Sequence, residues 1–187
     1  MSIVSHPLTY ADLERARETT DERLELIAGE IVVAPSPKPF HQFVSQRLYD
    51  RLKLAVVDAG LGLIGYAPLD VCFSEQTILQ PDLIVLLNDR VAQIGDDCVA
   101  GPPSLVIEIV SPSTSDRDQG TKRDLYAHYG VPEYWVVDPG TRTATVFSHP
   151  LHGQYRDKAT SSETLVSVTI AGLSVDLAEI FAPVRRS

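Results

Sequence analysis

Apolar residues in the N-terminal third of the chain follow first the period of a strand and then that of a helix. Residues 24–27 and 31–33 are apolar runs on either side of a short glycine-containing turn, which predicts a β-hairpin. Residues 40–59 carry apolar side chains at helical spacing, and Gly60 is a typical helix end. A capping-box pattern at Thr9 predicts a short helix to about residue 17.

The rest of the chain alternates short strands with one further helix. A strand over 63–73 is expected to break near Pro68, and a helix is expected from Ser115 or Asp116 to Tyr129. Further strands are predicted at 133–138, 143–147 and 165–170, with a short helix near 177–181. The pattern predicts a mixed fold of the α/β (α+β) type.

Two acidic residues stand in runs that otherwise have the character of buried strands. Asp82 precedes Leu83–Leu87, and Glu108 interrupts Leu105–Val110. A carboxylate in an apolar interior costs several kcal/mol unless something binds it. We therefore expect Asp82 and Glu108 to hold Mg²⁺ or Mn²⁺, with the backbone carbonyl of Ile109 as a further ligand.

Each of these acids has a simpler interpretation. Glu108 could face water from an edge strand, although Val106 and Val110 make the same face of the strand apolar. Asp82 follows Pro81, and a Pro-Asp pair is a common turn signature. The metal hypothesis depends on the two strands pairing, so that the carboxylates lie close together.

Lys122 is the candidate cation of this site. Asp118, Lys122 and Tyr126 are spaced by four residues and share one helix face. Lys122 could form a solvent-exposed ion pair with Asp118, which would contribute little. It could instead point at the metal site and stabilise a phosphoryl transition state.

Three more polar residues are weaker candidates. Glu30 follows the hairpin turn and could approach the same site or face solvent. His41, at the start of the long helix, could contact a phosphate or be structural. Gln80, two residues before Asp82, could support the acids.

Composition limits the protein class. A chain of 187 residues with 44% hydrophobic and 22% charged residues is expected to form one soluble domain over 1–187. It has neither a membrane-spanning apolar run nor signal-peptide features, so a cytoplasmic location is expected, with Cys72 and Cys98 as reduced thiols. The net charge of −9 argues weakly against nucleic acid as a partner, but acids around a catalytic metal would contribute to it.

Several motifs together resemble a large bacterial family of restriction endonucleases within the PD-(D/E)xK nuclease superfamily. They are residues 26–31, 35–37 with His41, 80–83, 108–114, Asp118, Lys122, Tyr126, 130–131 and 133–139. The resemblance extends over roughly residues 8 to 180, and the segment from Glu108 to Asp138 is its most specific part.

The resemblance implies a restriction-endonuclease-like core, a central mixed sheet flanked by helices. It implies Mg²⁺-dependent hydrolysis of DNA, with Asp82 and Glu108 as metal ligands and Glu30 as an additional acid. The superfamily lysine is expected two residues after Glu108, but Val110 stands there. The resemblance therefore assigns the catalytic lysine to Lys122, with His41, Gln80, Asp118 and Tyr126 as supporting residues.

Two other functions stay open. The protein could be a nuclease fold without turnover that binds DNA or protein, or a hydrolase acting on another phosphodiester. Because one small site cuts one strand, cleavage of both strands of a duplex predicts a homodimer.

Overall fold

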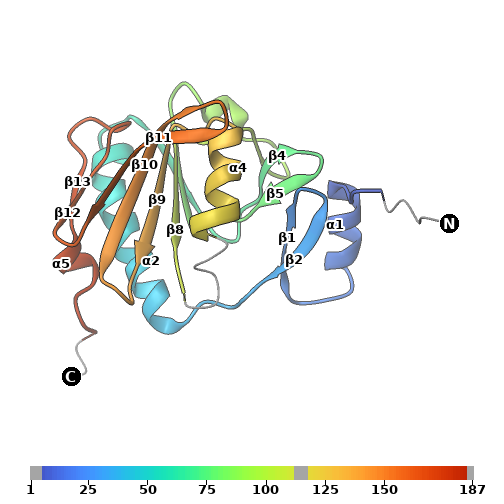
Figure 1. Cartoon of the computed structure of the whole chain (residues 1–187), viewed down its shortest axis with the longest axis horizontal. Helices are drawn as coiled ribbons and strands as arrows, with labels where there is room; N and C mark the ends of the chain where they lie inside the picture. Colours follow the sequence, from blue (N-terminus) through green and yellow to red (C-terminus); the bar gives the residue numbers. More distant parts are fainter. Residues whose placement is uncertain (1–5, 112–117, 185–187) are drawn as a thin grey trace.

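A six-stranded mixed sheet forms the centre of the protein. The structure, a computed structural model, describes residues 6–111 and 118–184 (Figure 1). The strand order is β11-β10-β9-β8-β6-β3, with β8 and β9 parallel and the other neighbours antiparallel. In chain order the strands are β3 (Gly62–Tyr66), β6 (Leu83–Leu87), β8 (Leu105–Ile109), β9 (Glu133–Asp138), β10 (Thr143–Leu151) and β11 (Gln154–Ser161).

Helices cover both faces of this sheet. Helix α2 (Pro39–Leu52) packs on one face through Val44, Leu48 and Leu52, and a π-helical turn over Lys53–Val57 extends it. Helix α4 (Arg123–His128) packs on the opposite face and follows a π-helical turn over Asp118–Lys122 (Figure 1).

A second, five-stranded sheet lies beside the first, on the side of the N-terminus (Figure 1). Its order is β2-β1-β5-β4-β7, and its strands are β1 (Arg23–Ile27), β2 (Glu30–Ala34), β4 (Val71–Ser74), β5 (Thr77–Leu79) and β7 (Val99–Ala100). Helix α1 (Tyr10–Arg17) packs on it through Leu13. Ile27 and Leu79 of this sheet share an apolar cluster with Ile84 and Val106 of the central sheet, which fits the proposal of a single domain.

The remaining elements are short. They are the 3₁₀ turn Val91–Gln93, the strand pair β12 (Thr164–Val166) and β13 (Ser174–Asp176), and α5 (Leu177–Ile180). Arg47 of α2 donates to the carbonyls of Ile180 and Ala182 and so ties α5 to α2.

Most of the expected elements are present. The predicted hairpin is β1–β2, and the Thr9 capping box and the long helix are confirmed. Residues 63–73 form two strands of different sheets, β3 and β4, on either side of Pro68. The predicted cap at Ser115 or Asp116 lies outside the described residues.

The C-terminal part departs from expectation. β11 was not predicted, because its exposed, polar residues lack an apolar alternation, and it forms only by pairing with β10. The strand expected over 165–170 is limited to β12. No helix in residues 6–111 or 118–184 is long and apolar enough to cross a membrane.

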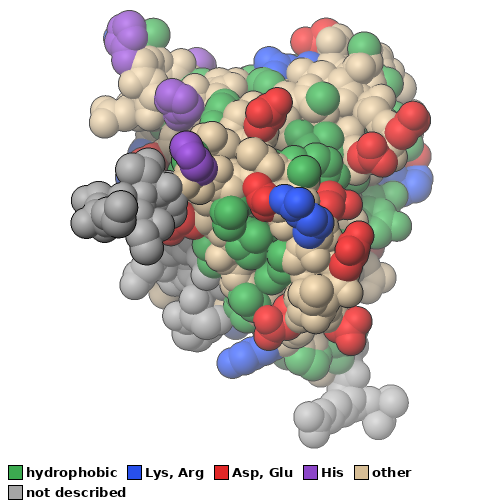
Figure 2. Space-filling view, turned by 90° about the vertical axis from the view of Figure 1, so that its right-hand side faces the viewer, with side chains coloured by type: hydrophobic (Ala, Val, Ile, Leu, Met, Phe, Trp, Pro, Cys, Tyr) green, Lys and Arg blue, Asp and Glu red, His purple; other side chains and the backbone are tan. Residues whose placement is uncertain are grey.

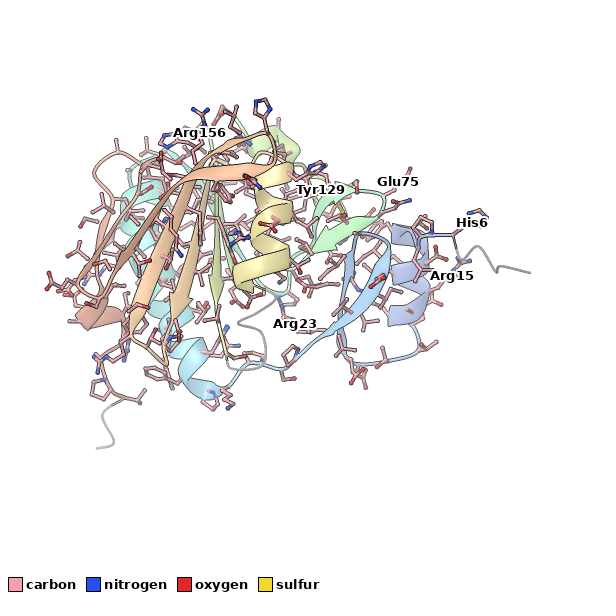
Figure 3. All side chains as sticks on the ribbon, in the orientation of Figure 1. His6, Arg15, Arg23, Glu75, Tyr129 and Arg156 are labelled. Carbon is pink, nitrogen blue, oxygen red and sulfur yellow. A yellow bond between two sulfur atoms is a disulfide. The ribbon has the colours of Figure 1, made fainter. Side chains whose placement is uncertain are left out.

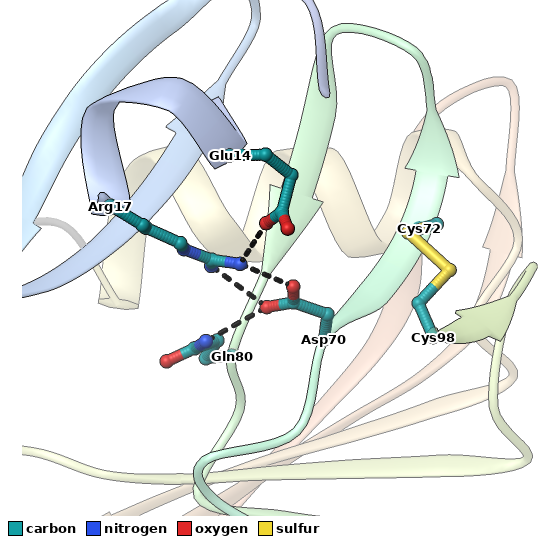
Figure 4. The surroundings of a disulfide bond; sticks show 6 residues. All are labelled: Glu14, Arg17, Asp70, Cys72, Gln80 and Cys98. Carbon is teal, nitrogen blue, oxygen red and sulfur yellow. Dashed lines mark hydrogen bonds and ion pairs between the residues drawn. A yellow bond between two sulfur atoms is a disulfide. The ribbon is translucent and has the colours of Figure 1, made fainter. Parts of the chain in front are cut away.

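The expectation of two reduced cysteines is wrong for this structure, because Cys72 and Cys98 form a disulfide (Figure 4). β4 and β7 pair in parallel, with Val71 opposite Val99, and this brings the two cysteines to a Cα–Cα distance of 6.2 Å. That distance is within the normal range for a disulfide. The pairing joins positions 26 residues apart, so no local pattern could indicate it.

Candidate active site

The pairing of β6 with β8 brings the two strand acids together. Leu83 lies opposite Ile107 in this antiparallel pair, and one further step of the same register sets Asp82 opposite Glu108. Directly opposed residues of an antiparallel pair project their side chains to the same face. The two carboxylates therefore share the face of the sheet that α4 covers.

Two contacts hold the side chain of Asp82, which directly precedes β6. The backbone N–H of Ile109 donates to its Oδ2 over 2.8 Å, and Nε2 of His41 lies 3.1 Å from the same oxygen. His41 reaches the site from the first turn of α2. The backbone group of Ile109 that meets Asp82 is thus its N–H, and its carbonyl stays only a proposed ligand.

Lys122 points into the site from the π-helical turn that precedes α4. Its Nζ lies 2.9 Å from Oε1 of Glu108 and 2.9 Å from Oε1 of Glu25, with Oδ1 of Asp118 at 3.9 Å. Lys122 is 5% exposed and Asp118 is 4% exposed. This burial excludes the interpretation of Lys122 as a solvent-exposed partner of Asp118.

Glu25, and not Glu30, is the acid that the N-terminal sheet contributes. Side chains alternate along β1, so Arg23, Glu25 and Ile27 face the central sheet, while Leu24 and Leu26 pack under α1. Glu25 is 1% exposed and accepts the backbone N–H of Gln80 over 2.8 Å. Glu30 begins β2 next to the hairpin turn, is exposed and does not line the cleft.

Tyr126 of α4 contacts Glu108 from the helix side of the sheet. Its buried hydroxyl donates to Oε1 of Glu108 over 2.8 Å, so Lys122 and Tyr126 bind the same oxygen. Burial raises the pKa of Tyr126 well above the usual value for a tyrosine, and the charge of Glu108 adds to this effect. The tyrosine therefore remains a hydrogen-bond donor at neutral pH.

The acids change one another's ionisation. Burial raises the pKa of Glu108 to about 8 against the lowering effect of Lys122, and Asp118, Asp82 and Glu25 raise it further. Burial by itself would lower the pKa of Lys122, but Glu108, Glu25 and Asp118 outweigh it and raise that pKa. The lysine thus stays charged within a cluster of acids that retains a proton near neutral pH.

A chain of hydrogen bonds connects the cluster to α1. Nε2 of Gln80 donates to Oδ1 of Asp70 over 2.8 Å, and Arg17 binds both oxygens of Asp70 at 2.6 and 2.9 Å (Figure 4). Since Gln80 also donates its N–H to Glu25, this chain fixes β1 against β5 at the site. Gln80 thus links Glu25 to Asp70.

Arg23 adds positive charge to the rim of the site. It lies where β1 approaches the lower end of α4 (Figure 3), and it is half-buried. Within residues 6–111 and 118–184, its guanidinium makes only long hydrogen bonds, 3.4 and 3.5 Å, both to Gln80. The side chain can therefore turn toward an anion in the cleft at little cost.

The cleft between these groups is narrow, with a volume of about 80 Å³. The chain segment from Ala34 to Lys38 and Ser111 form its mouth, and Glu25, Asp82, Glu108 and Lys122 line its floor. A space of this size suits an ion and a phosphate group better than a bulky organic ligand.

The donor set fits a hard cation bound together with substrate. In the described part of the chain, no hydrogen bond ends on Oδ1 of Asp82 or Oε2 of Glu108, so each carboxylate has one oxygen left for a metal. No cluster of three or more His, Cys, Asp or Glu side chains among the described residues is arranged to hold a metal by itself. Mg²⁺ is commonly bound by one or two carboxylates, with water and phosphate oxygens as its other ligands.

Glu25 and Arg23 line the cleft but were not among the sequence candidates. Glu25 is a carboxylate inside the apolar run 24–27, just as Glu108 is a carboxylate inside an apolar strand. The same signal could therefore have identified Glu25. Arg23 has no such signal, because a basic residue at the start of a strand is usually solvated.

Comparison with known proteins places this site in a family context. The family model described as "Putative restriction endonuclease" (Uma2) matches residues 8–178, nearly the whole chain. The chain belongs to the Uma2 family. No curated protein matches it.

A solved structure shares the Uma2 fold seen here. It is the crystal structure of a putative nuclease belonging to DUF820 from Anabaena variabilis ATCC 29413, with a TM-score of 0.77 and 20% sequence identity. The match covers 94% of this chain and 98% of that one. The central mixed sheet with helices on both faces is consistent with the restriction-endonuclease-like fold.

Proposed function

We propose that this Uma2 protein is a Mg²⁺-dependent endonuclease that hydrolyses DNA phosphodiester bonds. One observation carries the proposal: four ionisable side chains from four separate segments meet in one cleft, with Glu25, Glu108 and Lys122 buried and Asp82 half-buried. Buried charges are costly, and a fold that needed only stability could fill these positions with apolar residues. The family and the nuclease fold support the same function.

Each residue has a role that its contacts support. Asp82 and Glu108 would hold the metal through Oδ1 and Oε2, which face no hydrogen-bond donor among the described residues. A divalent cation supplies charge to the phosphate oxygens and makes a bound water more acidic. Manganese has the same preference for oxygen ligands and could replace magnesium.

Lys122 would stabilise the developing negative charge of the phosphoryl group and orient the attacking water. Its raised pKa keeps it charged, and Glu25 and Glu108 hold it in position, so the ammonium is preorganised before substrate binds. Arg23 at the rim would bind the phosphate, and His41 would orient Asp82.

A plasmid-nicking assay tests the proposal. Wild-type protein should nick supercoiled DNA in Mg²⁺ or Mn²⁺ and not in excess chelator, and Glu108→Gln should abolish nicking. Glu75→Gln is the matched control, since Glu75 is an exposed glutamate in the turn between β4 and β5 (Figure 3). Metal-independent nicking, or full activity of Glu108→Gln, would count against the proposal.

Glu25→Gln and Glu30→Gln separate two assignments of the fourth acid. The structure favours Glu25, so Glu25→Gln should lose activity and Glu30→Gln should keep it. The opposite result would restore the role that the family resemblance gives to Glu30.

A nuclease fold without turnover is the second candidate. The net charge of −9 favours it, because a strongly acidic protein binds DNA weakly and gains little from contact with the phosphate backbone. Well-folded wild-type protein that nicks DNA in neither metal would support this candidate.

A further inference from the structure

A groove continues from the catalytic cleft along one side of α2. The cleft and the groove share Arg23, Pro37, His41 and Asp82 as lining residues. The groove has a volume of about 420 Å³. This lies within the range of about 300–1,000 Å³ that is typical of small-molecule sites. The groove is thus large enough for a ligand part that the narrow cleft cannot hold.

One wall of the groove is a polar stripe of α2. Gln42, Ser45, Gln46 and Tyr49 line it, and their spacing places them on one helix face. Across the described residues, no hydrogen bond involves the side-chain amide of Gln42 or Gln46. These amides can therefore donate to and accept from a ligand in the groove.

The other wall carries an exposed aromatic ring, that of Tyr66 at the end of β3. Tyr66 is 62% exposed, which is unusual for a large aromatic residue. Tyr49 contacts it edge-to-face, with ring centroids 5.8 Å apart and planes at 89°. This contact restrains the ring, so Tyr66 offers a held aromatic surface to the groove.

Strand register brings the backbone of Tyr66 next to that of Asp82. Tyr66 lies opposite Leu83, one residue from Asp82, and the N–H of Ala67 donates to the carbonyl of Asp82 over 3.2 Å. Sheet dimensions place the backbones of Tyr66 and Asp82 within roughly 6 Å of each other. Because Asp82 and Tyr66 both line the groove, a group bound on Tyr66 lies about one nucleotide away from a phosphate bound at Asp82.

We propose that the groove binds one unpaired nucleobase of the DNA strand, adjacent to the scissile phosphate. The base stacks on Tyr66, and its polar edge meets the amides of Gln42 and Gln46, whose side-chain type recognises base edges in other proteins. This subsite rests on the proposed nuclease function. It makes single-stranded or locally opened DNA the substrate class of the enzyme.

Base stacking and charge both favour an unpaired strand over an intact duplex. A paired base is stacked on both faces within the helix and cannot reach Tyr66 without being extruded. The cleft and groove offer few cations, chiefly Arg23, Lys38 and Lys122, whereas a duplex brings phosphates of two strands. The side of the molecule that carries α1 shows scattered acidic side chains with single basic ones among them, and no broad basic patch is seen among the described residues in that view (Figure 2).

Binding and cleavage measured separately test the subsite. Fluorescence anisotropy, with Ca²⁺ in place of Mg²⁺, compares a labelled strand of mixed sequence with the same strand annealed to its complement. The single strand should bind more tightly, and Tyr66→Ala should weaken its binding about tenfold, the loss of one stacking contact. Tyr66→Phe should bind like the wild type, because the ring and not the hydroxyl provides the stacking.

Phe43→Ala is the matched control, because Phe43 is an exposed aromatic residue on α2 outside the groove and should have no effect. Gln46→Ala gives a second variant whose folding is not in question, since the side chain is exposed, and it should weaken single-strand binding severalfold. Unchanged binding by both Tyr66→Ala and Gln46→Ala would overturn the subsite. Binding of duplex by the wild type at least as tightly as single strand would also overturn the subsite. The same holds if Tyr66→Ala binds single strand like the wild type and differs from it only in no longer forming a dimer.

Cleavage in Mg²⁺ distinguishes failure of the subsite from failure of the nuclease assignment. Glu108-dependent cleavage that Tyr66→Ala leaves unchanged would retain the nuclease and remove the subsite. Single-strand binding that depends on Tyr66, without any cleavage by the wild type, would retain the subsite and remove the nuclease.

Discussion

Nζ of Lys122 lies 2.9 Å from Oε1 of Glu108, although the two residues are 14 positions apart and belong to different elements. The position two residues after Glu108, where the superfamily lysine is expected, holds Val110, which is buried in the apolar cluster under α4. A lysine from the turn before α4 thus reaches the strand glutamate from another part of the backbone. The contact is buried, so each side chain needs the other to compensate the cost of its burial.

Replacing Lys122 should therefore affect both activity and stability. Lys122→Ala should lower cleavage by about 10²–10³, the usual loss for one electrostatic donor to a transition state. It should also lower the free energy of unfolding by about 3–5 kcal/mol, because it leaves buried carboxylates without their cation. Lys122→Arg should restore activity poorly, since a planar guanidinium does not fit where a compact ammonium is held.

Single-turnover cleavage and urea denaturation measure the two effects of Lys122→Ala separately. Wild-type cleavage by a folded Lys122→Ala protein would show that the lysine only balances the charge of the acids.

The metal-free protein should lose stability as the pH rises from about 4.5 to about 8. Glu108 has a folded-state pKa of about 8 against an ordinary value of 4.5, so its contribution is fully present below 4.5 and is lost as the pH rises through 8. Within this range the unfolded chain releases the proton and the folded protein keeps it. Thermal melts in chelator over this pH range check the slope, and Glu108→Gln should flatten it.

Metal binding should release a proton at neutral pH. The cation and the proton compete for Glu108, whose pKa is about 8, so affinity for Mg²⁺ should rise by about tenfold per pH unit and level off above pH 8. Calorimetry in two buffers of different ionisation enthalpy measures the proton. A pH-independent affinity, or metal binding by Glu108→Gln as tight as that of the wild type, would contradict this role of Glu108.

Reducing the disulfide should destabilise the protein without altering the catalytic residues. Cys72–Cys98 closes a loop across β4 and β7, for which loop-closure entropy predicts about 3–4 kcal/mol of stabilisation. Urea denaturation with and without dithiothreitol should show this difference. The double variant Cys72→Ser/Cys98→Ser is the control and should not respond to the reductant.

Double-strand cleavage should depend on a homodimer. The described residues of each chain form one candidate site, and two copies are needed to cut two strands. Analytical ultracentrifugation across a range of protein concentrations, beside a plasmid assay that separates nicked from linear DNA, checks this prediction. A strict monomer that linearises plasmid in one binding event would disprove it, whereas a monomer that only nicks agrees with the single-strand subsite.

Much of the fold was accessible from local sequence patterns. The hairpin β1–β2, helix α2 and strands β6, β8 and β9 follow from hydrophobic period and turn residues, which act over a few neighbouring positions. The unusual placement of Asp82 and Glu108 in apolar runs also marked them as candidates, because burying a carboxylate is costly wherever the strand lies.

Tertiary structure decided which acids and cations meet. Glu25 and Glu30 both stand near the first hairpin, and only the packing of one face of β1 against the central sheet places Glu25, and not Glu30, against Lys122. In the same way, the disulfide, strand β11 and the opposition of Tyr66 to Leu83 depend on strand pairing between distant segments. Local patterns constrain what each residue can tolerate, but contacts between distant residues are selected by the total free energy of the packed sheets, to which the whole chain contributes.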